Sequence, residues 1–475
     1  MQSMLTYAVR RIGLHRGSPR VWLQGREPSK GGFHPGSRFN VQVDREKSTV
    51  VLEVANDGVR LVSAKSKGDR TIPVIDLNSR ELLQVFDGMD AVRVVVEAGR
   101  ISLLPLASEV RAQRRTARLR RKLLAGEPIS VGTVASGVGI LDGAAHAGMA
   151  AAGLVSQLAF FNEVREDCVD HMVDRNPVVG NDTIHLQAPM QELAFDSAAM
   201  ARLPEVDLVI GGIPCSGASR AGKAQRGSSY AEAHPEVGHL VVAFLAIIAK
   251  VNPAAIVLEN VVPWAHTASM CILRNQLRDL GYDVHDTTLK AGDWNLLEHR
   301  DRLCVVAVTR GLTFRFDGLE RPTPASRMFA EIMDDVPLDA DCWSPMSYLK
   351  EKRRRDEASG SNFKMTIVGP ESPKLATLTK TLWKRQSTGN FIQHPLDPEL
   401  LRLPTVAEHA RAKGVDLELV RDVGMTFGHE VLGQSVSVPP FIAVFKHLGQ
   451  ALMSWASASA SHRAAAFCLP VLKAA

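Results

Sequence analysis

The chain has 475 residues, of which 45% are hydrophobic and 23% charged, and its formal net charge is +5. This balance is typical of a globular protein of about three domains and excludes a disordered or fibrous chain. No apolar run reaches the roughly 18 residues that a membrane-spanning helix needs, and the first residues lack the order of a secretory signal. We therefore expect a cytoplasmic protein without a membrane partner.

Six cysteines are scattered along the chain, and none belongs to a Cys-x-x-Cys pair. This spacing argues against zinc and against a redox motif, so no metal is expected. A disulfide framework is not expected in so large a chain without a signal peptide. By default, each cysteine is interpreted as a small buried hydrophobic residue.

Positive charge is concentrated near the N-terminus. Residues 1–128 hold 23 Lys and Arg against 13 Asp and Glu, whereas the remainder holds 33 against 38. This asymmetry predicts a polyanionic partner for the N-terminal part, although a solvated surface would give the same count.

Residues 1–107 are predicted to form a small β-rich domain. Turn formers such as HPGS and ANDG separate its short strand-like runs, which lie at 38–43, 49–54, 92–97 and 100–104. Residues 108–127 follow as a basic helical linker with few apolar positions. The linker is either solvated or in contact with phosphate.

Residues 128–312 alternate between strand-like and helical stretches. The apolar runs end in glycine or acidic residues, and they lie at 129–134, 206–210, 255–258 and 303–309. This alternation predicts an α/β domain with a largely parallel sheet.

The alternation stops at residues 313–400, which carry many prolines and the charge cluster KEKRRR at 350–355. We interpret this region as a smaller inserted domain. Residues 401–453 are predicted to be helical, with a strand-like VLGQSVSV, and residues 454–475 are an Ala/Ser-rich tail.

A glycine motif follows the first strand of the α/β domain, in ISVGTVASGVGILDG at 129–143. Glycines after a strand let the backbone approach a ligand, and the next helix offers free N–H groups. A tight turn needed for packing explains this motif about as well.

Two acidic residues follow later strand-like runs. Glu163, in LAFFNEV, could hold both hydroxyls of a ribose. Asp182, in VVGNDTIHL, ends a third such unit, where it could face an adenine amino group. Together these junctions predict an adenosine-type cofactor, and the absence of a P-loop lysine pattern argues against phosphate transfer.

Three further motifs carry candidate chemistry. VDLVIGGIPCSGAS delivers Pro214 and Cys215 onto a loop after a buried strand, where a cysteine is better exposed than in a core. AAIVLENV ends in Glu259, which could equally be a helix cap. EHRDR at 298–302 places two arginines two residues apart on an extended segment, where they point the same way. Such a pair could bracket a carbonyl oxygen or a phosphate, and a pair of surface ion pairs is the alternative explanation.

These motifs, in this order, resemble the DNA cytosine-5 methyltransferase family over residues of about 129–453. The last two family motifs are visible at 402–414 and 429–452, and TLTKTLWKRQSTGNFIQHP at 377–395 is similar to the segment before them. The resemblance implies an α/β, Rossmann-like catalytic domain at 128–312 and 401–453. It makes residues 313–400 a target-recognition domain.

The resemblance also implies the reaction: transfer of a methyl group from S-adenosylmethionine to carbon 5 of cytosine in duplex DNA, within a restriction–modification system. The cysteine forms a covalent adduct with a base flipped out of the helix, and no metal is needed. Catalytic roles fall to Cys215, Glu259, Arg300 and Arg302. Cofactor contacts fall to Ser136, Gly137, Val138, Gly139, Glu163, Val164, Asp182, Thr183, Pro214, Gln434 and Ser435.

The chain departs from the family pattern at five positions. Ala135 stands where the family has an aromatic residue, and Ile213 where it has a proline. Ser216 and Glu298 each replace a glutamine of the family, and Gln434 replaces an asparagine. These changes leave open an inactive homologue that only binds DNA. Cytosine-5 methylation of RNA by the same chemistry is a further alternative, although the large inserted region and the basic N-terminal unit favour DNA. The oligomeric state is left open, with a monomer expected on DNA.

The N-terminal domain also resembles, over VWLQGREPSKGGFHPGSRFNVQV, small swapped-hairpin DNA-binding and toxin modules with a Gly-Phe-x-x-Gly turn before a strand. This short resemblance favours DNA binding and a scaffold role equally.

Overall fold

The computed structural model describes residues 3–214, 230–360 and 365–467, and the side chains of its last helix as far as residue 458. The chain divides into two compact units, residues 1–113 and 114–475. Each unit has its own hydrophobic core.

The first unit consists of two antiparallel sheets. The larger has the order β1-β9-β10-β5-β4-β6, and the smaller the order β2-β3-β8-β7. The strands are β1 (Thr6–Arg11), β2 (Gly13–His15), β3 (Ser18–Gln24), β4 (Arg38–Asp44), β5 (Thr49–Val54), β6 (Arg60–Leu61), β7 (Ser63–Lys67), β8 (Arg70–Asn78), β9 (Ala91–Glu97) and β10 (Arg100–Pro105). Two short helices, α1 (Arg26–Lys30) and α2 (Arg80–Leu83), complete it.

Alternating apolar residues of both sheets form the core of the first unit. Leu23 of β3, Leu52 of β5 and Val94 of β9 are fully buried in it. The Gly-Phe-x-x-Gly turn adds Phe33, also fully buried, and its glycines have φ of 80° and 84°. Such positive φ values favour glycine, so the turn needs the motif read from the sequence.

Helix α3 (Ala107–Ala125) spans the predicted linker, and several of its basic side chains contact protein. Arg115 is buried and donates hydrogen bonds to Thr309 and to the carbonyl of Gly281. Arg118 and Lys122 contact Asp207, at 2.9 and 2.6 Å. These cations therefore fix the C-terminal half of the helix within the second unit. The sequence had predicted a linker that is either solvated or in contact with phosphate, and neither prediction included these contacts with protein.

The second unit is built on a seven-stranded sheet of order β13-β12-β11-β14-β15-β17-β16. Its first five strands are parallel, and β17 runs antiparallel to both neighbours. The strands are β11 (Ile129–Val134), β12 (Ser156–Glu163), β13 (Ile184–Gln187), β14 (Leu208–Gly211), β15 (Ala255–Asn260), β16 (Tyr282–Lys290) and β17 (Asp301–Thr309). This is the Rossmann-like α/β architecture that the sequence predicted.

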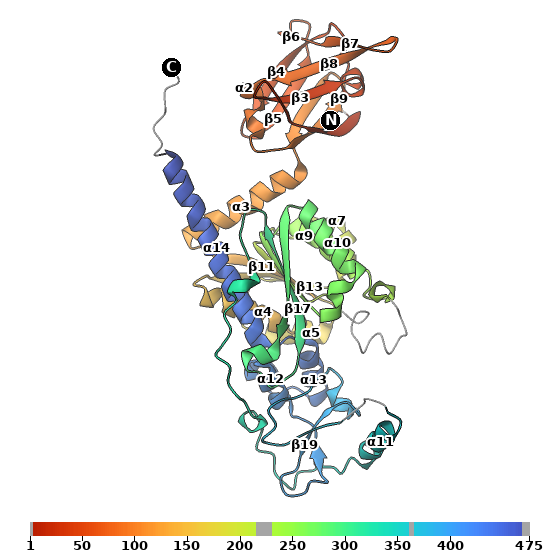
Figure 1. Ribbon diagram of the computed structural model, residues 1–475, viewed down its shortest axis with the longest axis vertical. Coiled ribbons are helices and arrows are strands. Elements are labelled where there is room, and N and C mark those ends of the chain that lie inside the picture. Colours follow the sequence, from red (N-terminus) through yellow and green to blue (C-terminus); the bar gives the residue numbers. More distant parts are fainter. Residues whose placement is uncertain (1–2, 215–229, 361–364, 468–475) are drawn as a thin grey trace. The chain divides into compact units, whose positions relative to one another are not determined.

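Both faces of this sheet are covered, so its strands are apolar on both sides. On β15, Ala255 and Val257 face one core cluster, whereas Ile256 and Leu258 face the other. Figure 1 shows α4 and α14 on one side of the sheet and α9 and α10 on the other. The helices around the sheet are α4 (Ile140–Ala151), α5 (Glu166–Arg175), α6 (Met190–Phe195), α7 (Ser197–Arg202), α9 (Leu240–Val251), α10 (Ala268–Asp279), α12 (Val406–Lys413), α13 (Met425–Gln434) and α14 (Val438–Phe467).

The C-terminal segment differs from the prediction in two places. The strand-like VLGQSVSV belongs to helices, because α13 contains its first four residues and α14 begins at its last. Helix α14 also continues through much of the predicted tail, to Phe467. It packs against α4 through glycines: a side-chain carbon on Gly148 would lie 2.5 Å from Cβ of Phe445, and one on Gly449 would lie 2.6 Å from Cβ of Ala152.

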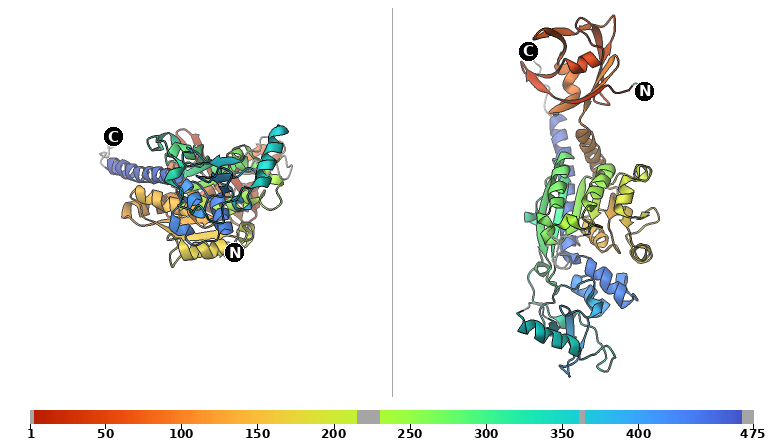
Figure 2. Two further views of the ribbon diagram at one scale, coloured as in Figure 1. Left: turned by 90° about the horizontal axis from the view of Figure 1, so that it is seen from below. Right: turned by 90° about the vertical axis from the view of Figure 1, so that its right-hand side faces the viewer.

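The inserted region carries β18 (Thr366–Val368), β19 (Asn390–Gln393) and helix α11 (Ser347–Ala358). Strand β20 (Leu401–Arg402), directly after the predicted end of this region, completes a three-stranded sheet with the two strands. Figure 2 shows it beside α12 and α13, at one end of the second unit. Across the described parts of the chain, no helix has both the length and the apolar character to span a membrane.

Asp207 joins α3 to the sheet and generates a prediction about stability. Burial would raise its pKa, but hydrogen bonds from Lys122, Arg118 and the amide of Ser130 outweigh burial and lower it. We expect Asp207→Ala to cost about 1–3 kcal/mol of unfolding free energy, because the partly buried Arg118 and Lys122 lose their shared carboxylate. Urea unfolding measures this loss.

The stabilisation from the ionised carboxyl is present above its unfolded pKa of about 3.9 and disappears as pH falls through the lower folded pKa. The acid limb of the stability curve should therefore be shallower in Asp207→Asn than in the wild type. Equal slopes of unfolding free energy against pH on the acid side of the two curves would contradict the lowered pKa assigned to Asp207.

Candidate active site

The candidate site lies where the parallel strands of the second unit end. Parallel strands bring their carboxyl ends to one edge of a sheet, where α/β proteins bind ligands. At this edge, β11 leads into the glycine motif and β12 ends at Glu163. Strand β14 leads into the loop to Pro214, and β15 carries Glu259 at its end.

The glycine motif forms a tight turn between β11 and α4. Gly137 and Gly139 have φ of 57° and 76°. A side chain at Gly139 would lie 2.4 Å from Nδ2 of Asn176, whereas one at Gly137 would meet open space. Asn176 donates hydrogen bonds of 3.0 Å to the carbonyls of Val138 and Gly139 and so fixes the turn. Gly137 is thus the position where the backbone is open to a ligand.

Glu163 ends β12 and is held beside that turn. Its Oε2 accepts a 2.8 Å hydrogen bond from the amide of Gly137, and its Oε1 accepts from the amides of Val164 and Arg165. These bonds fix the carboxylate toward the glycine turn. Ser136 is tied to the same strand, since its amide donates to the carbonyl of Asn162 at 3.1 Å.

Asp182 and Thr183 do not reach this edge, so their predicted place is wrong. They precede β13 instead of ending it, and Thr183 donates to the carbonyl of Leu158 near the middle of β12. Gln187, the last residue of β13, lies five positions after Asp182, which is roughly 16 Å along a strand. Gln187, paired with Glu163 across the sheet, is the polar residue that sequence reasoning missed.

The loop after β14 leads through Gly212 and Ile213 to Pro214, the last described residue before the gap. Cys215, the predicted nucleophile, lies outside the described residues. The loop is tethered to the next strand, because Nδ2 of Asn260 donates to the carbonyl of Ile213 at 3.2 Å. Asn260 directly follows Glu259, so this bond brings the end of β15 to the loop that continues into Cys215.

Glu259 and Arg302 form an ion pair of 2.8 Å between Oε1 and Nε. They come from neighbouring antiparallel strands, with Glu259 opposite Cys304 in the register. Both side chains remain partly exposed, 13% and 16%. A carboxylate and a guanidinium therefore lie together at the edge where the loop from β14 to Pro214 begins.

Arg300 contacts groups that differ from the Glu259 partner of Arg302. Arg300 is buried, donates a 2.9 Å hydrogen bond to the carbonyl of Gly433 in α13, and lies 3.5 Å from Glu298. Its burial does not fit direct contact with a substrate. It fits a positioning role between β17 and α13.

Glu298 lies at the centre of a buried polar cluster. Its Oε1 accepts a 2.9 Å hydrogen bond from the amide of Leu378 in the inserted region, and its Oε2 lies 2.8 Å from Nζ of Lys413 in α12. Burial would raise the pKa of Glu298, but Lys413 and Arg300 lower it below its ordinary value. Burial and Arg300 lower the pKa of Lys413 to about 7, against the opposing effect of Glu298.

Two buried histidines belong to the same region. The Nδ1 atoms of His409 and His429 lie 3.0 Å apart, and the rings are stacked. Burial lowers the pKa of His429 to about 4 and that of His409 well below its ordinary value. Both imidazoles are therefore neutral at pH 7 and add no charge to the cluster.

Gln434 and Ser435 lie at the C-terminal end of α13. Four residues before Gln434, on the same helix face, Glu430 forms a 3.2 Å ion pair with Arg165, whose amide holds Glu163. The motif at 429–452 thus lies at the same edge of the sheet as the glycine turn. Arg165 connects the two, and sequence analysis did not single it out.

Among the described cysteines, Cys168 and Cys304 are buried, whereas Cys271 and Cys342 are exposed. Burial raises the pKa of the Cys168 thiol to about 12 and also raises that of Cys304. Raised thiol pKa values disfavour the thiolate, so neither buried cysteine suits nucleophilic chemistry.

The residues at this edge fit an adenosine-type cofactor. Gly137 leaves open space beside the turn, and Glu163 presents a fixed carboxylate of the kind that accepts hydrogen bonds from ribose hydroxyls. Val138 is buried, so only its backbone is available to a ligand. The fit therefore rests on Gly137 and Glu163.

Comparison with solved structures agrees with this architecture. The Dnmt2 methyltransferase of S. pombe matches with a TM-score of 0.51 and 16% identity, over 70% of this chain and 99% of that one. The Entamoeba histolytica methyltransferase EhMeth matches with a TM-score of 0.52 and 15% identity, over 69% and 98%. The second unit thus has the fold of a methyltransferase.

The family model for C-5 cytosine-specific DNA methylases matches residues 136–450. The chain belongs to this family. Among curated relatives, the type II methyltransferase M1.ScrFI of Lactococcus lactis subsp. cremoris is 27% identical over 262 residues, 53% of this chain and 64% of that protein. A DNA-cytosine methyltransferase of Escherichia coli K12 is 27% identical over 286 residues, 52% and 61%. The matches thus span less than two thirds of these relatives' lengths.

The buried pair of Glu298 and Lys413 generates a prediction. Glu298→Gln restores the family's residue but leaves Lys413 and Arg300 without the carboxylate, so each of Glu298→Gln and Lys413→Met should cost about 3–5 kcal/mol of unfolding free energy. The double variant should lose less than the sum of the single variants by about 1–3 kcal/mol. Urea unfolding of all four proteins tests this, and simple additivity would show that the pair is not coupled.

Proposed function

We propose that the chain transfers a methyl group from S-adenosylmethionine to carbon 5 of cytosine in duplex DNA, within a restriction–modification system. One observation carries the proposal. The partly exposed pair of Glu259 and Arg302 lies at the edge where Asn260 tethers the loop that runs through Pro214 to Cys215.

Cys215 is the proposed nucleophile. Carbon 5 of cytosine is a weak nucleophile, and attack of the Cys215 thiolate on carbon 6 moves the double-bond electrons toward carbon 5 and ring nitrogen 3. Such covalent catalysis divides one difficult step into two easier ones. The burial of Cys168 and Cys304 supports the choice of a loop cysteine.

Glu259 would donate a hydrogen bond from its protonated carboxyl to ring nitrogen 3 and accept one from the exocyclic amine, and so stabilise negative charge that develops on the ring. Arg302 would hold the base carbonyl, since its ion pair keeps it next to Glu259. Arg300 is assigned to position this strand against α13. Loss of the carbon 5 proton and elimination of the Cys215 thiolate then complete the reaction.

S-adenosylmethionine supplies the methyl group on a sulfonium centre. Glu163 would accept hydrogen bonds from the ribose hydroxyls, with the open backbone at Gly137 beside it. Gln187 takes the place first assigned to Asp182, because it ends β13. The exposed Val164 and Gln434 are proposed to line the same site.

A cytosine within a stacked duplex exposes none of the reacting atoms to a protein loop, so the base has to be flipped out. The inserted residues 313–400 are the proposed source of sequence specificity. Lys350, Lys352 and Arg353 of α11 already form ion pairs with carboxylates of this chain. Phosphate contacts through α11 would therefore require these pairs to exchange partners.

Cys215→Ser should abolish methylation without unfolding the protein, because the hydroxyl is a far weaker nucleophile than a thiolate. On DNA with 5-fluorocytosine at the target, the wild-type protein should form an adduct that survives a denaturing gel, since fluorine cannot leave as the proton does. Cys271→Ser, which changes an exposed cysteine of α10, is the matched control and should react normally. Normal methylation by Cys215→Ser would overturn the mechanism.

Glu163→Ala should weaken S-adenosylmethionine binding about 10- to 150-fold, because hydrogen bonds to a charged group contribute about 1.5–3 kcal/mol. Asp182→Ala should leave the affinity unchanged, since Asp182 precedes β13 at the other end of the strand. Calorimetry on both folded variants measures the difference. Equal losses of S-adenosylmethionine affinity in the two variants would show that Asp182 belongs to the cofactor site.

A further inference from the structure

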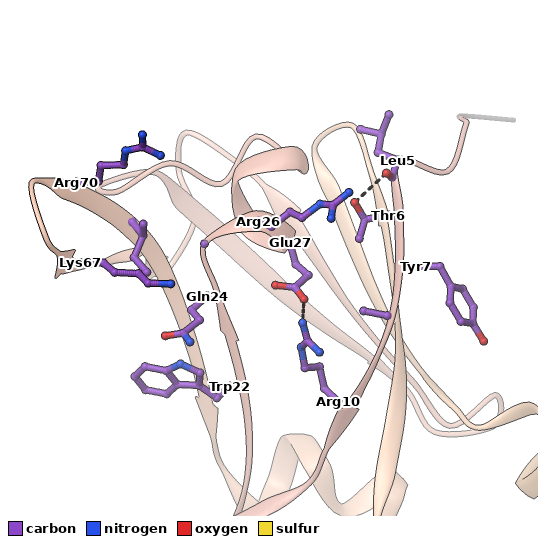
Figure 3. Close-up of a pocket in the computed structure, with 13 residues that line it drawn as sticks. Leu5, Thr6, Tyr7, Arg10, Trp22, Gln24, Arg26, Glu27, Lys67 and Arg70 are labelled. Carbon is purple, nitrogen blue, oxygen red and sulfur yellow. Dashed lines mark hydrogen bonds and ion pairs between the residues drawn. The ribbon is translucent and has the colours of Figure 1, made fainter.

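The first unit contains an open groove of about 1180 Å³ that the catalytic proposal does not use. Strand β1 forms one side, β3 and the β7–β8 hairpin form the other, and the start of α1 lies between them (Figure 3). Its volume exceeds the roughly 300–1,000 Å³ of small-molecule pockets. An extended ligand therefore suits it better than a small molecule.

The groove has an excess of positive charge. Its charged lining residues are Arg10, Arg26, Lys67 and Arg70 against Glu27. Glu27 is buried and paired with Arg10. Arg26, Lys67 and Arg70 are exposed, and within the described part of the chain none of the three forms an ion pair. Three solvated cations thus line one concave surface.

The aromatic residues of the groove are not arranged to stack on bases. The ring of Trp22 already has Arg20 at 4.3 Å and Lys65 at 6.0 Å from its centroid. Tyr7 points away from the groove (Figure 3). Proteins that bind single strands combine a basic groove with available aromatic faces, whereas contacts to the backbone of a duplex need no base stacking and are made by groups such as arginine and lysine.

We infer that this groove binds the sugar–phosphate backbone of duplex DNA independently of sequence, through Arg26, Lys67 and Arg70. Lys67 and Arg70 pair with each other across the β7–β8 hairpin, and Arg26 begins α1, so the three cations come from two separate segments. Phosphate contacts of this kind position a protein on DNA without reading its sequence. The groove would give the enzyme a second DNA-binding site, which takes no part in recognition of the target sequence.

The test compares two charge-matched triple variants of the full chain. Arg26→Gln/Lys67→Gln/Arg70→Gln changes the groove, and Arg16→Gln/Arg45→Gln/Arg80→Gln changes three exposed arginines that do not line it. Fluorescence anisotropy with a duplex of no cytosine target measures affinity against salt concentration. The groove variant should bind more weakly, and its plot of log affinity against log salt should be less steep by about 2.7, since each phosphate contact contributes about 0.9.

The control variant should keep the wild-type slope, and the groove variant should keep the methylated target sequence and its rate at saturating DNA. Equal slope changes in the two variants, or none, would overturn the inference. A larger loss on single-stranded DNA or RNA of the same length would overturn the assignment to duplex. Binding is measured without methyl transfer, so failure of the proposed reaction would not obscure the result.

Discussion

The arrangement of the second unit depends on one buried carboxylate, that of Glu298. Its two oxygens meet a lysine of α12 and a backbone amide of the inserted region, and it lies beside Arg300, which reaches α13. A buried charge is tolerated only when its partners replace water. The segment before β17, the inserted region and two C-terminal helices are therefore held in one relative position, and β17 carries Arg302 into the site.

The same constraint explains a departure from the family pattern. A neutral glutamine at this position could not balance a buried lysine, so Glu298 and Lys413 make physical sense only together. The change leaves the pair of Glu259 and Arg302 in place. By contrast, the replacement of the family's asparagine by Gln434 falls on an exposed helix end, where a longer amide is accommodated without repacking.

Sequence patterns predicted what depends on local periodicity. The run at 129–134 coincides with β11, and the glycine motif and Glu163 do follow their strands. Asp182 was misplaced because an acidic residue before a strand looks like one after it when the strand is short. Pairs such as Glu298 with Lys413 join residues more than a hundred positions apart, and a single sequence has no signal for them. The inward-facing arginines of α3 were missed because basic residues are usually solvated.

The contact between α14 and α4 bears on how the chain is made. Helix α4 follows the first strand of the catalytic sheet, and the glycines that let α14 approach it lie near both ends of this domain in the sequence. During synthesis, the apolar face of α4 stays uncovered until α14 has left the ribosome. A growing chain with such a contact exposes hydrophobic surface until the later segment has been synthesised. The apolar face of α4 is therefore a surface through which unfinished chains can aggregate until α14 covers it.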